Sequence, residues 1–434
     1  MDEKMRVLFV SGELIAGDLA YRLKNEGCDV KLYVKDKSRR DCFDGMVEKV
    51  ADWKKELKWV GKDGLIVFDD INYGKIQDDL RKKGYLVVGG SEKGDKLELD
   101  REYGHKIFST CEIKIVSTKN FSDIEDAISF VKRNKGKWVV KQNDHQSYLN
   151  YVGQAEDGRD VVSILENYKS RKIKAVNLQE KIEGIEIGVA RYFNGKDWVG
   201  PIEFNLEHKD LHNGNIGPKT GEMGTVIWYS EDESNKIYQA TLEKLKRFLI
   251  HTNFKGDIDV NCIVNEKEVF PIEATSRFGC PSTHLQEELH LSPWKDFLMA
   301  LAKGEEYNLK YKKGFGVVVS VCVPPFPYKA IDKNFYSRGV SILFKDILKE
   351  EELNSIHFEE ASLSKEKDGD TYTVGGSNGF ILYVTSSGAT VEKAREKAYS
   401  VVKKIVIPQM FYRTDIGEKF INEDQANLKK WGWI

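Results

Sequence analysis

The first part of the chain alternates short apolar runs with segments of helical periodicity, and this order strongly limits the folds open to it. Residues 6–10 (RVLFV) are typical of a buried parallel strand, and the polar turn after them leads into a helix that we expect to end near Asn25. A second strand at 29–34 completes a βαβ unit. The same order then repeats, with predicted strands at 64–68 and 85–88 and a predicted helix at 76–83. We therefore predict a small doubly wound α/β domain with a parallel sheet over residues 1–92.

Beyond residue 92 the predicted strands follow one another more closely, which favours antiparallel sheets. We predict a central region over residues 93–312, with a small α+β lid at about 117–190, and a C-terminal domain over residues 313–434. The chain is thus expected to be a multidomain protein of mixed α/β and α+β class. Predicted helices are 97–108, 123–134, 235–251 and 391–403; predicted strands are 137–141, 175–178, 185–192, 198–203, 224–229, 257–264, 268–273, 314–323 and 380–385.

Composition and charge exclude several classes of protein. With a formal net charge of −2, the chain has no overall basic field that would attract nucleic acid or a membrane surface. It opens with charged residues rather than a signal peptide, and no segment approaches the ~20 apolar residues of a membrane span. The six cysteines are far apart and form no CxxC pair. We therefore expect a cytoplasmic protein with reduced thiols and without a zinc site.

Four motifs occur in order along most of the chain. They are QEKIEGIEIG at 179–188, GPKTGEMGT at 217–225, PIEATSRFGCPSTHLQ at 271–286, and SSGATVEKAREKAYSVVKKI at 386–405 followed by FYRTDIG at 411–417. In sequence, order and spacing these motifs resemble those of the glycinamide ribonucleotide synthetase (phosphoribosylamine–glycine ligase) family. The resemblance implies an ATP-grasp ligase with an N-terminal α/β domain, central ATP-grasp subdomains and a C-terminal lobe.

The reaction that the resemblance implies is ATP-dependent ligation, as in purine nucleotide biosynthesis. ATP phosphorylates a carboxylate, and an amine then attacks the acyl phosphate. Such a site must hold a polyphosphate, neutralise its charge and exclude water. The implied cofactors are ATP and Mg²⁺ (or Mn²⁺). The implied partners are small molecules only, namely ATP, an amino acid or other carboxylate, and an amine. We expect no nucleic-acid or membrane partner, and a monomer or homodimer.

The resemblance assigns two cations and a hinge to ATP. Arg101 stands at a helix start where the family has lysine, and Lys141 ends the strand at 137–141; both are expected to bind phosphates during catalysis. Gln179 and Glu180 would lie in a hinge that cradles adenine, and Glu186 would accept hydrogen bonds from the ribose. The alternatives are an exposed helix arginine, a lysine that extends from a strand end into water, and ordinary surface acids.

A glycine-rich loop is the next candidate for binding ATP. Glycines allow backbone amides to approach an anion closely. The alternative is a tight turn with a purely structural role. The loop residues that the resemblance assigns to the nucleotide are Gly217, Thr220, Gly221 and Gly224.

The resemblance also implies a metal site next to the acyl phosphate. Glu273 follows an apolar strand at the position where the family carries a carboxylate that binds Mg²⁺, a cation that prefers oxygen ligands. Asn261 on the preceding strand, and Thr275 where the family has asparagine, are the other candidate ligands. Arg277 matches a family arginine and is expected to stabilise charge on the acyl phosphate. The alternative is a structural ion pair between Glu273 and Arg277.

The sequence departs from the family where the resemblance places the amine substrate. Asp69 and Asp70 would repel the phosphate of phosphoribosylamine, which favours another amine. The loop at 144–152 (DHQSYLNYV) also lacks the glycines that the family places over the phosphates. Three hypotheses stay open: phosphoribosylamine–glycine ligase, a related ligase with other substrates, and a degenerate homologue that binds nucleotide without ligation. The departures at the amine site are SGELIAGDL at 11–19, FDDINY at 68–73 and CPS at 280–282.

Overall fold

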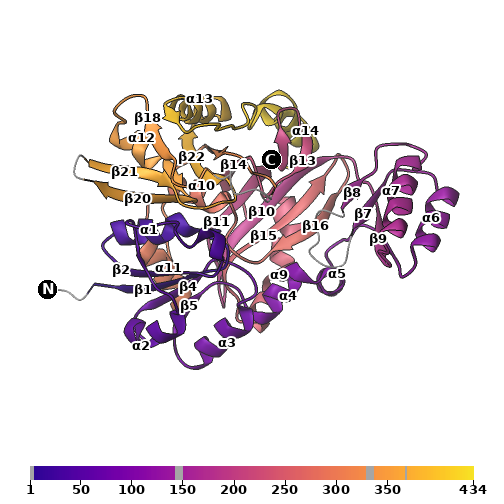
Figure 1. Ribbon diagram of the computed structural model, residues 1–434. Coiled ribbons are helices and arrows are strands. Elements are labelled where there is room, and N and C mark those ends of the chain that lie inside the picture. The colour runs from indigo at the N-terminus through magenta and orange to yellow at the C-terminus, as the bar shows by residue number, and fades with distance from the viewer. Residues whose placement is uncertain (1–3, 142–149, 329–336, 367–368) are drawn as a thin grey trace.

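The N-terminal part of the molecule is a parallel sheet with helices on both faces (Figure 1). The computed structural model describes residues 4–141, 150–328, 337–366 and 369–434. Five strands lie in the order β3-β2-β1-β4-β5, and every pairing between them is parallel. The elements are β1 (Arg6–Ser11), α1 (Gly17–Asn25), β2 (Asp29–Val34), β3 (Glu48–Lys49), α2 (Leu57–Val60), β4 (Leu65–Phe68), α3 (Gly74–Lys82) and β5 (Leu86–Val88).

Strand β1 shows why its sequence is a continuous apolar run. Val7 and Phe9 pack into the core on the side of α1, whereas Leu8 and Val10 pack into the core on the side of α2 and α3. A strand that is buried on both faces needs apolar side chains at every position. The predicted doubly wound domain is therefore confirmed.

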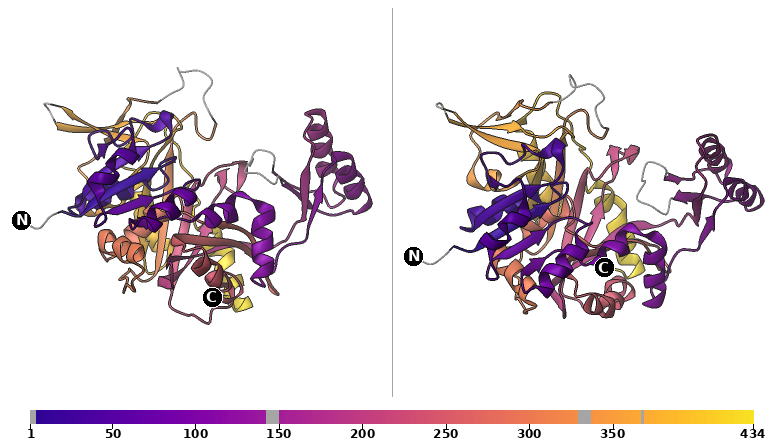
Figure 2. Two further views of the ribbon diagram at one scale, coloured as in Figure 1. Left: turned by 90° about the horizontal axis from the view of Figure 1, so that it is seen from below. Right: turned by 60° about the horizontal axis from the view of Figure 1, so that its bottom comes forward.

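A small subdomain projects from the body of the molecule (Figures 1 and 2). Its four strands lie in the order β6-β9-β7-β8, two helices cover them, and its hydrophobic core is separate from the others. We call it the lid. The predicted phosphate-covering loop at 144–152 falls largely on residues 142–149, which lie outside the described residues. The lid elements are β6 (Thr118–Phe121), α6 (Ile124–Arg133), β7 (Trp138–Lys141), β8 (Tyr151–Val152), α7 (Arg159–Ser170) and β9 (Val176–Glu180).

An eight-stranded sheet forms the centre of the molecule, with the strand order β16-β15-β10-β11-β14-β17-β22-β19. Every pairing in it is antiparallel, as the closely spaced strands predicted. Because β17 pairs with β14, the sheet continues across the predicted boundary at 312, and the domain limits stay predictions. The strands are β10 (Ile185–Asn194), β11 (Trp198–Glu207), β14 (Gly224–Ser230), β15 (Lys255–Val264), β16 (Val269–Thr275), β17 (Phe315–Cys322), β19 (Ile356–Phe358) and β22 (Phe380–Gly388).

The C-terminal part adds a second sheet, β20-β21-β18-β23, and several helices around the central sheet. None of the helices within the described ranges is long and apolar enough to cross a membrane. The α-helices and strands after β16 that are not named above are α10 (Ser282–Leu289), α11 (Trp294–Lys303), β18 (Ser341–Phe344), α12 (Glu350–Asn354), β20 (Ala361–Glu366), β21 (Gly369–Val374), α13 (Val391–Val402), β23 (Ile405–Val406) and α14 (Gln425–Trp431).

Two predicted helices are each divided in the structure. The helix predicted at 97–108 becomes α4 (Glu92–Leu99) and α5 (Arg101–Thr110), because Asp100 leaves the helical conformation and its side chain accepts a hydrogen bond from the amide of Tyr103 at 3.0 Å. Aspartate favours this capping position. Arg101 thereby becomes the first residue of α5. The helix predicted at 235–251 is divided at Thr241 into α8 (Lys236–Ala240) and α9 (Leu242–His251).

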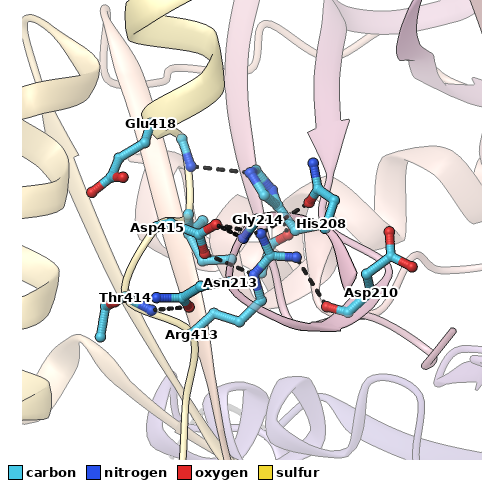
Figure 3. Close-up of polar contacts among 12 residues, drawn as sticks. His208, Asp210, Asn213, Gly214, Arg413, Thr414, Asp415 and Glu418 are labelled. Atoms are coloured by element: carbon cyan, nitrogen blue, oxygen red, sulfur yellow. Dashed lines mark hydrogen bonds and ion pairs between the residues drawn. The ribbon is translucent and has the colours of Figure 1, made fainter. Parts of the chain in front are cut away.

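A hairpin follows β11 and is held by the C-terminal motif FYRTDIG (Figure 3). It consists of β12 (Asp210–His212) and β13 (Ile216–Lys219). The buried guanidinium of Arg413 donates to the carbonyl of Asp210 at 2.9 Å and to both carboxylate oxygens of Asp415 at 2.8 and 2.7 Å. Asp415 also accepts from the amide of Gly214 at 2.8 Å. These bonds fix the start of the hairpin, and with it Lys209, against the C-terminal segment.

His208 occupies the other side of this junction. The amide of Gly417 donates to Nε2 of His208 at 3.1 Å, so Nδ1 carries the hydrogen and donates to the carbonyl of Gly224 at 3.2 Å. Burial, together with the nearby charge of Arg413, lowers the pKa of His208 to about 4. The ring is therefore neutral at pH 7 and acts as a fixed link between chain segments.

We predict that the stability of the protein depends on pH through His208. Its pKa is about 4 in the folded state, against ~6.5 in an unfolded chain. Between these values the unfolded chain binds more protons, so the contribution is present at pH 7 and is lost as the pH falls below 6.5. The stability advantage of the wild type over H208Q should shrink by about 2 kcal/mol between pH 7 and pH 5. Urea unfolding of both proteins at each pH measures this difference; an equal advantage at both values would contradict it.

Candidate active site

Charged side chains from the lid, α5 and the central sheet converge at one place. Lys141 ends β7 of the lid, Arg101 begins α5, and Glu186 and Glu273 lie on β10 and β16. Lys141, Arg101 and Glu273 are close enough to shift one another's pKa values. The structure thus brings together four residues that the sequence assigned to ATP and its metal ion.

Lys209, which the sequence analysis missed, lies at the centre of this group. Its Nζ is 2.7 Å from a carboxylate oxygen of Glu207, 3.0 Å from Glu186 and 3.2 Å from Glu273. A signal was present in the sequence, because Glu207 and Lys209 interrupt the apolar pattern just before the motif at 217–225. Lys209 follows the end of a strand, the same kind of position that led to the prediction for Lys141.

Electrostatic interactions within this group keep Lys209 and Glu273 charged. Burial opposes the charge on Lys209, but Glu207, Glu186 and Glu273 outweigh it and raise the pKa of Lys209 well above its ordinary value. The same lysine is the main reason that the pKa of Glu273 falls to about 2, with Lys141 and Arg101 adding to the effect. Glu273 is therefore an anion throughout the physiological range, as a metal-binding carboxylate must be.

Lys141 and Arg101 form the cationic side of the site. Burial and the neighbouring charge of Arg101 lower the pKa of Lys141 to about 8, although Glu273 and Glu186 act in the opposite direction. Burial also lowers the pKa of Arg101. Two buried cations of this kind are stabilised when the negative charge of a polyphosphate binds beside them.

Candidate metal ligands lie on neighbouring strands beside Lys209. Asn261 on β15 pairs directly with Glu273 on β16, and Asp259 pairs with Thr275. The Nδ2 group of Asn261 donates to Glu207 at 3.2 Å, whereas its buried Oδ1 has no hydrogen-bond partner among the described residues. A buried oxygen without a donor, next to an ionised carboxylate, fits a hard cation such as Mg²⁺.

Arg277 makes a different contact from the ion pair with Glu273 that the sequence analysis left open. Its Nε is 3.1 Å from Glu98 on α4 and 4.0 Å from Asp70, which follows β4. Glu98 also accepts a hydrogen bond from the amide of Ser276 at 2.8 Å. Arg277 therefore joins the N-terminal sheet, α4 and the loop after β16, and its predicted role at the acyl phosphate stays a prediction.

The hinge and the glycine-rich segment flank the group. Gln179 is buried on β9 and Glu180 is exposed, while Glu186 faces Lys209.

The segment at 217–224 is a hairpin strand and turn rather than an open loop. Gly217 lies in β13, Gly221 lies in the turn, and Gly224 begins β14. The amide and hydroxyl of Thr220 both donate to the carbonyl of Lys209, at 2.7 and 2.8 Å. This segment therefore holds Lys209 in place, a function that the sequence did not reveal.

A pocket of about 340 Å³ adjoins Arg101, between α5 and the lid sheet. The volume is within the range of ~300–1,000 Å³ that small-molecule sites occupy. Burial, Arg101 and Lys141 lower the pKa of His105, which lines the pocket, to about 4, so this ring is neutral. The pocket is lined by Arg101, Glu102, His105, Ile115, Thr118, Asn120 and Asn177.

The two aspartates after β4 differ in environment. Asp69 is fully buried and accepts hydrogen bonds from the hydroxyl of Ser11 at 2.8 Å and the amide of Ala16 at 3.0 Å. Burial and the charge of Asp70 raise the pKa of Asp69 to about 7. Asp69 thus stabilises the turn after β1, whereas Asp70 lies 4.0 Å from Arg277.

Comparison with known proteins matches two parts of the chain to one family. Residues 99–283 match the ATP-grasp (A) domain of phosphoribosylglycinamide synthetase, and residues 334–419 match its C domain; together they cover more than half of the chain. Among the relatives, a phosphoribosylamine–glycine ligase of Helicobacter pylori is 26% identical over 357 residues, with 79% of each chain covered.

Solved structures share the fold. A phosphoribosylamine–glycine ligase from Thermotoga maritima superposes with a TM-score of 0.68 at 20% identity, covering 95% of this chain and 100% of its own. A biotin carboxylase from Campylobacter jejuni, in complex with an ATP analogue, gives a TM-score of 0.65 at 11% identity, with 99% of each chain covered. The chain therefore belongs with the phosphoribosylglycinamide synthetases, as an ATP-grasp ligase that forms a carbon–nitrogen bond.

Proposed function

We propose that the chain ligates an amino acid, glycine in the first instance, to an amine through an acyl phosphate that is formed from Mg-ATP in the cytoplasm. The observation that carries this proposal is the charge arrangement around Lys209. Three carboxylates surround this lysine, and Lys141 and Arg101 face one of them, Glu273. Anions for a metal ion and cations for phosphates therefore lie side by side, as phosphoryl transfer requires.

Each residue has a distinct role in this proposal. Lys141 and Arg101 bind the phosphates and stabilise the charge that develops during transfer. Glu273 and Asn261 would hold Mg²⁺, with Thr275 as a further ligand; the bound ion would supply charge neutralisation on the phosphate oxygens. Lys209 orients the carboxylates of Glu186 and Glu273. Glu186 would accept hydrogen bonds from the ribose once ATP binds.

The amine is proposed to be phosphoribosylamine, as in the names of the relatives, with purine biosynthesis as the metabolic role. One observation favours a second candidate, a ligase for a different amine. Arg277, the arginine nearest to Asp70, already contacts that aspartate and Glu98. A phosphate would have to compete with both carboxylates, whereas a cationic amine would not.

Replacement of Glu273 should remove the reaction without unfolding the protein. E273Q keeps the size of the side chain, which is 47% exposed, but takes away the anion that is proposed to hold the metal ion. We expect ADP formation to fall at least ~10²–10³-fold, while the protein stays folded and still unfolds in a cooperative thermal transition. E268Q is the matched control, since Glu268 is a similarly exposed glutamate just before β16 that pairs with Lys114. Full activity in E273Q would refute the metal role.

Lys209 should affect the reaction through the carboxylates that it orients. In K209M the three carboxylates repel one another, and the pKa of Glu273 rises toward its ordinary value. We expect kcat/KM for ATP to fall about 10²-fold, and the loss to grow as the pH is lowered toward 5. K219M is the control, because Lys219 is an exposed hairpin lysine that pairs only with Asp210 among the described carboxylates. Equal kinetics in the two variants would contradict the assigned role.

The substrates are tested by ADP release against a matrix of amino acids and amines that includes freshly generated phosphoribosylamine. Release with phosphoribosylamine and glycine supports the first candidate, and release with another pair supports the second. Mg-ATP should also raise the melting temperature, because a ligand that binds only the folded state stabilises it. Such a shift with no ADP release for any pair would refute ligase activity and indicate a nucleotide-binding protein.

A further inference from the structure

A group of metal-binding side chains lies in the interior, outside the ATP site. Asp18 belongs to α1, His284 and Glu287 are three residues apart on one face of α10, and His357 belongs to β19. All four side chains are buried, and α1 packs against both α10 and β19. The group therefore joins the N-terminal domain to the central sheet. We call it the His₂–carboxylate cluster.

The spacing of the cluster fits one small cation. Nδ1 of His357 is 3.0 Å from Oδ2 of Asp18 and 4.0 Å from Oε2 of Glu287, and Nδ1 of His284 is 3.4 Å from Oε1 of Glu287. All four ligand atoms lie within 4.8 Å of one another. A tetrahedral zinc site with bonds of ~2.0–2.1 Å separates its ligand atoms by about 3.3 Å. The separations of 3.0, 3.4 and 4.0 Å lie on both sides of this spacing, so the distances between the side chains suit one small ion.

Half of the cluster lacks hydrogen-bond partners. Both ring nitrogens of His284 and both carboxylate oxygens of Glu287 are buried without a hydrogen bond to any described residue. Buried polar atoms nearly always find a partner, and an unpaired buried carboxylate is costly. A cation bound between them would satisfy both side chains at once.

The ring of His357 is held on both sides. Its Nε2 lies 3.0 Å from the hydroxyl oxygen of Thr385, and that hydroxyl is 3.3 Å from the carbonyl of Ser355. Its Nδ1 lies 3.0 Å from Oδ2 of Asp18. A partner on the far ring nitrogen that fixes the orientation of the imidazole is typical of metal-binding histidines.

We propose that the His₂–carboxylate cluster is a structural binding site for a divalent transition-metal ion, with Zn²⁺ as the preferred occupant. Two neutral imidazoles and two carboxylates balance a charge of +2, and nitrogen and oxygen ligands in tetrahedral geometry suit Zn²⁺. Four protein ligands in a buried position leave no room for substrate, so the ion stabilises the junction and takes no part in ligation. Sequence analysis did not predict this site, because the expectation of no zinc site rested on cysteine spacing alone, whereas these ligands come from three distant segments.

The metal content of the purified full-length protein tests the proposal. After growth with added zinc and dialysis against magnesium buffer, elemental analysis should find about one zinc ion per chain. A strong chelator should remove it and lower the melting temperature by about 5 °C or more, and added Zn²⁺ should restore it. Cobalt exchanged into the site should give the visible absorption of a tetrahedral complex. Less than a tenth of an equivalent of any transition metal, with no response to chelator or zinc, would show a proton-bonded network instead.

Single substitutions in and next to the cluster test where the ion binds. E287Q keeps the shape of the side chain and should reduce zinc content at least tenfold, whereas E288Q should retain it. Glu288 is the next residue on α10 but pairs with Lys312 and Ser387 outside the cluster. C280S separates this site from a neighbouring group, Cys280, His284 and Glu359, that shares His284. Loss of zinc in C280S with retention in E287Q would overturn the assignment.

Discussion

The contact between Lys209 and three carboxylates determines how the ATP-binding half of the molecule is arranged. Glu186, Glu207 and Glu273 come from different strands of the central sheet, and without a cation their charges would repel one another. Lys209 lies between β11 and β12, and its carbonyl accepts hydrogen bonds from the amide and hydroxyl of Thr220. A single ammonium group therefore pairs with carboxylates from three strands, and one of these carboxylates, Glu273, is a proposed metal ligand.

Residues far from Lys209 in the sequence hold this lysine in position. The hairpin after Lys209 is fixed by the buried guanidinium of Arg413, and His208 links the same segment to Gly417. A buried arginine is stable only when its charge is paired, and here Asp415 supplies a two-oxygen contact. The C-terminal motif that resembled the family thus has a structural explanation, because it positions a residue of the ATP site from the far end of the chain.

The sequence predicted the elements of the fold well where a local pattern determines them. Strand β1 is apolar at every position because both faces are buried, and a run of this kind can be recognised without knowledge of its neighbours. The division of the helix at 97–108 depended on Asp100, whose capping function follows from its side chain but was not anticipated. A helix cap of this kind can be predicted from the sequence.

Sequence analysis could not predict features that depend on contacts between residues far apart in the chain. Lys209 gains its importance from carboxylates on other strands, and Arg277 meets Glu98 rather than Glu273 because α4 lies against β16. The His₂–carboxylate cluster brings Asp18 next to His357, and no spacing in the sequence indicates such a pair. Resemblance to a family located the segments of the site, but contacts between segments decide what each charged group does.

Charge at the junction of the N-terminal domain with the central sheet bears on the amine substrate. Cys280 lies within electrostatic reach of Arg277 and Arg39. Arg39 is buried against Glu359 at 2.5 Å and Glu360 at 3.2 Å, much as Arg277 contacts Glu98 and Asp70. A phosphate that entered here would have to displace a carboxylate from one arginine and leave that acid without a partner, which is costly in the interior. A cationic amine would instead meet carboxylates directly. The charge at this junction is thus the structural argument for the second candidate amine, whereas the family relationship supports phosphoribosylamine.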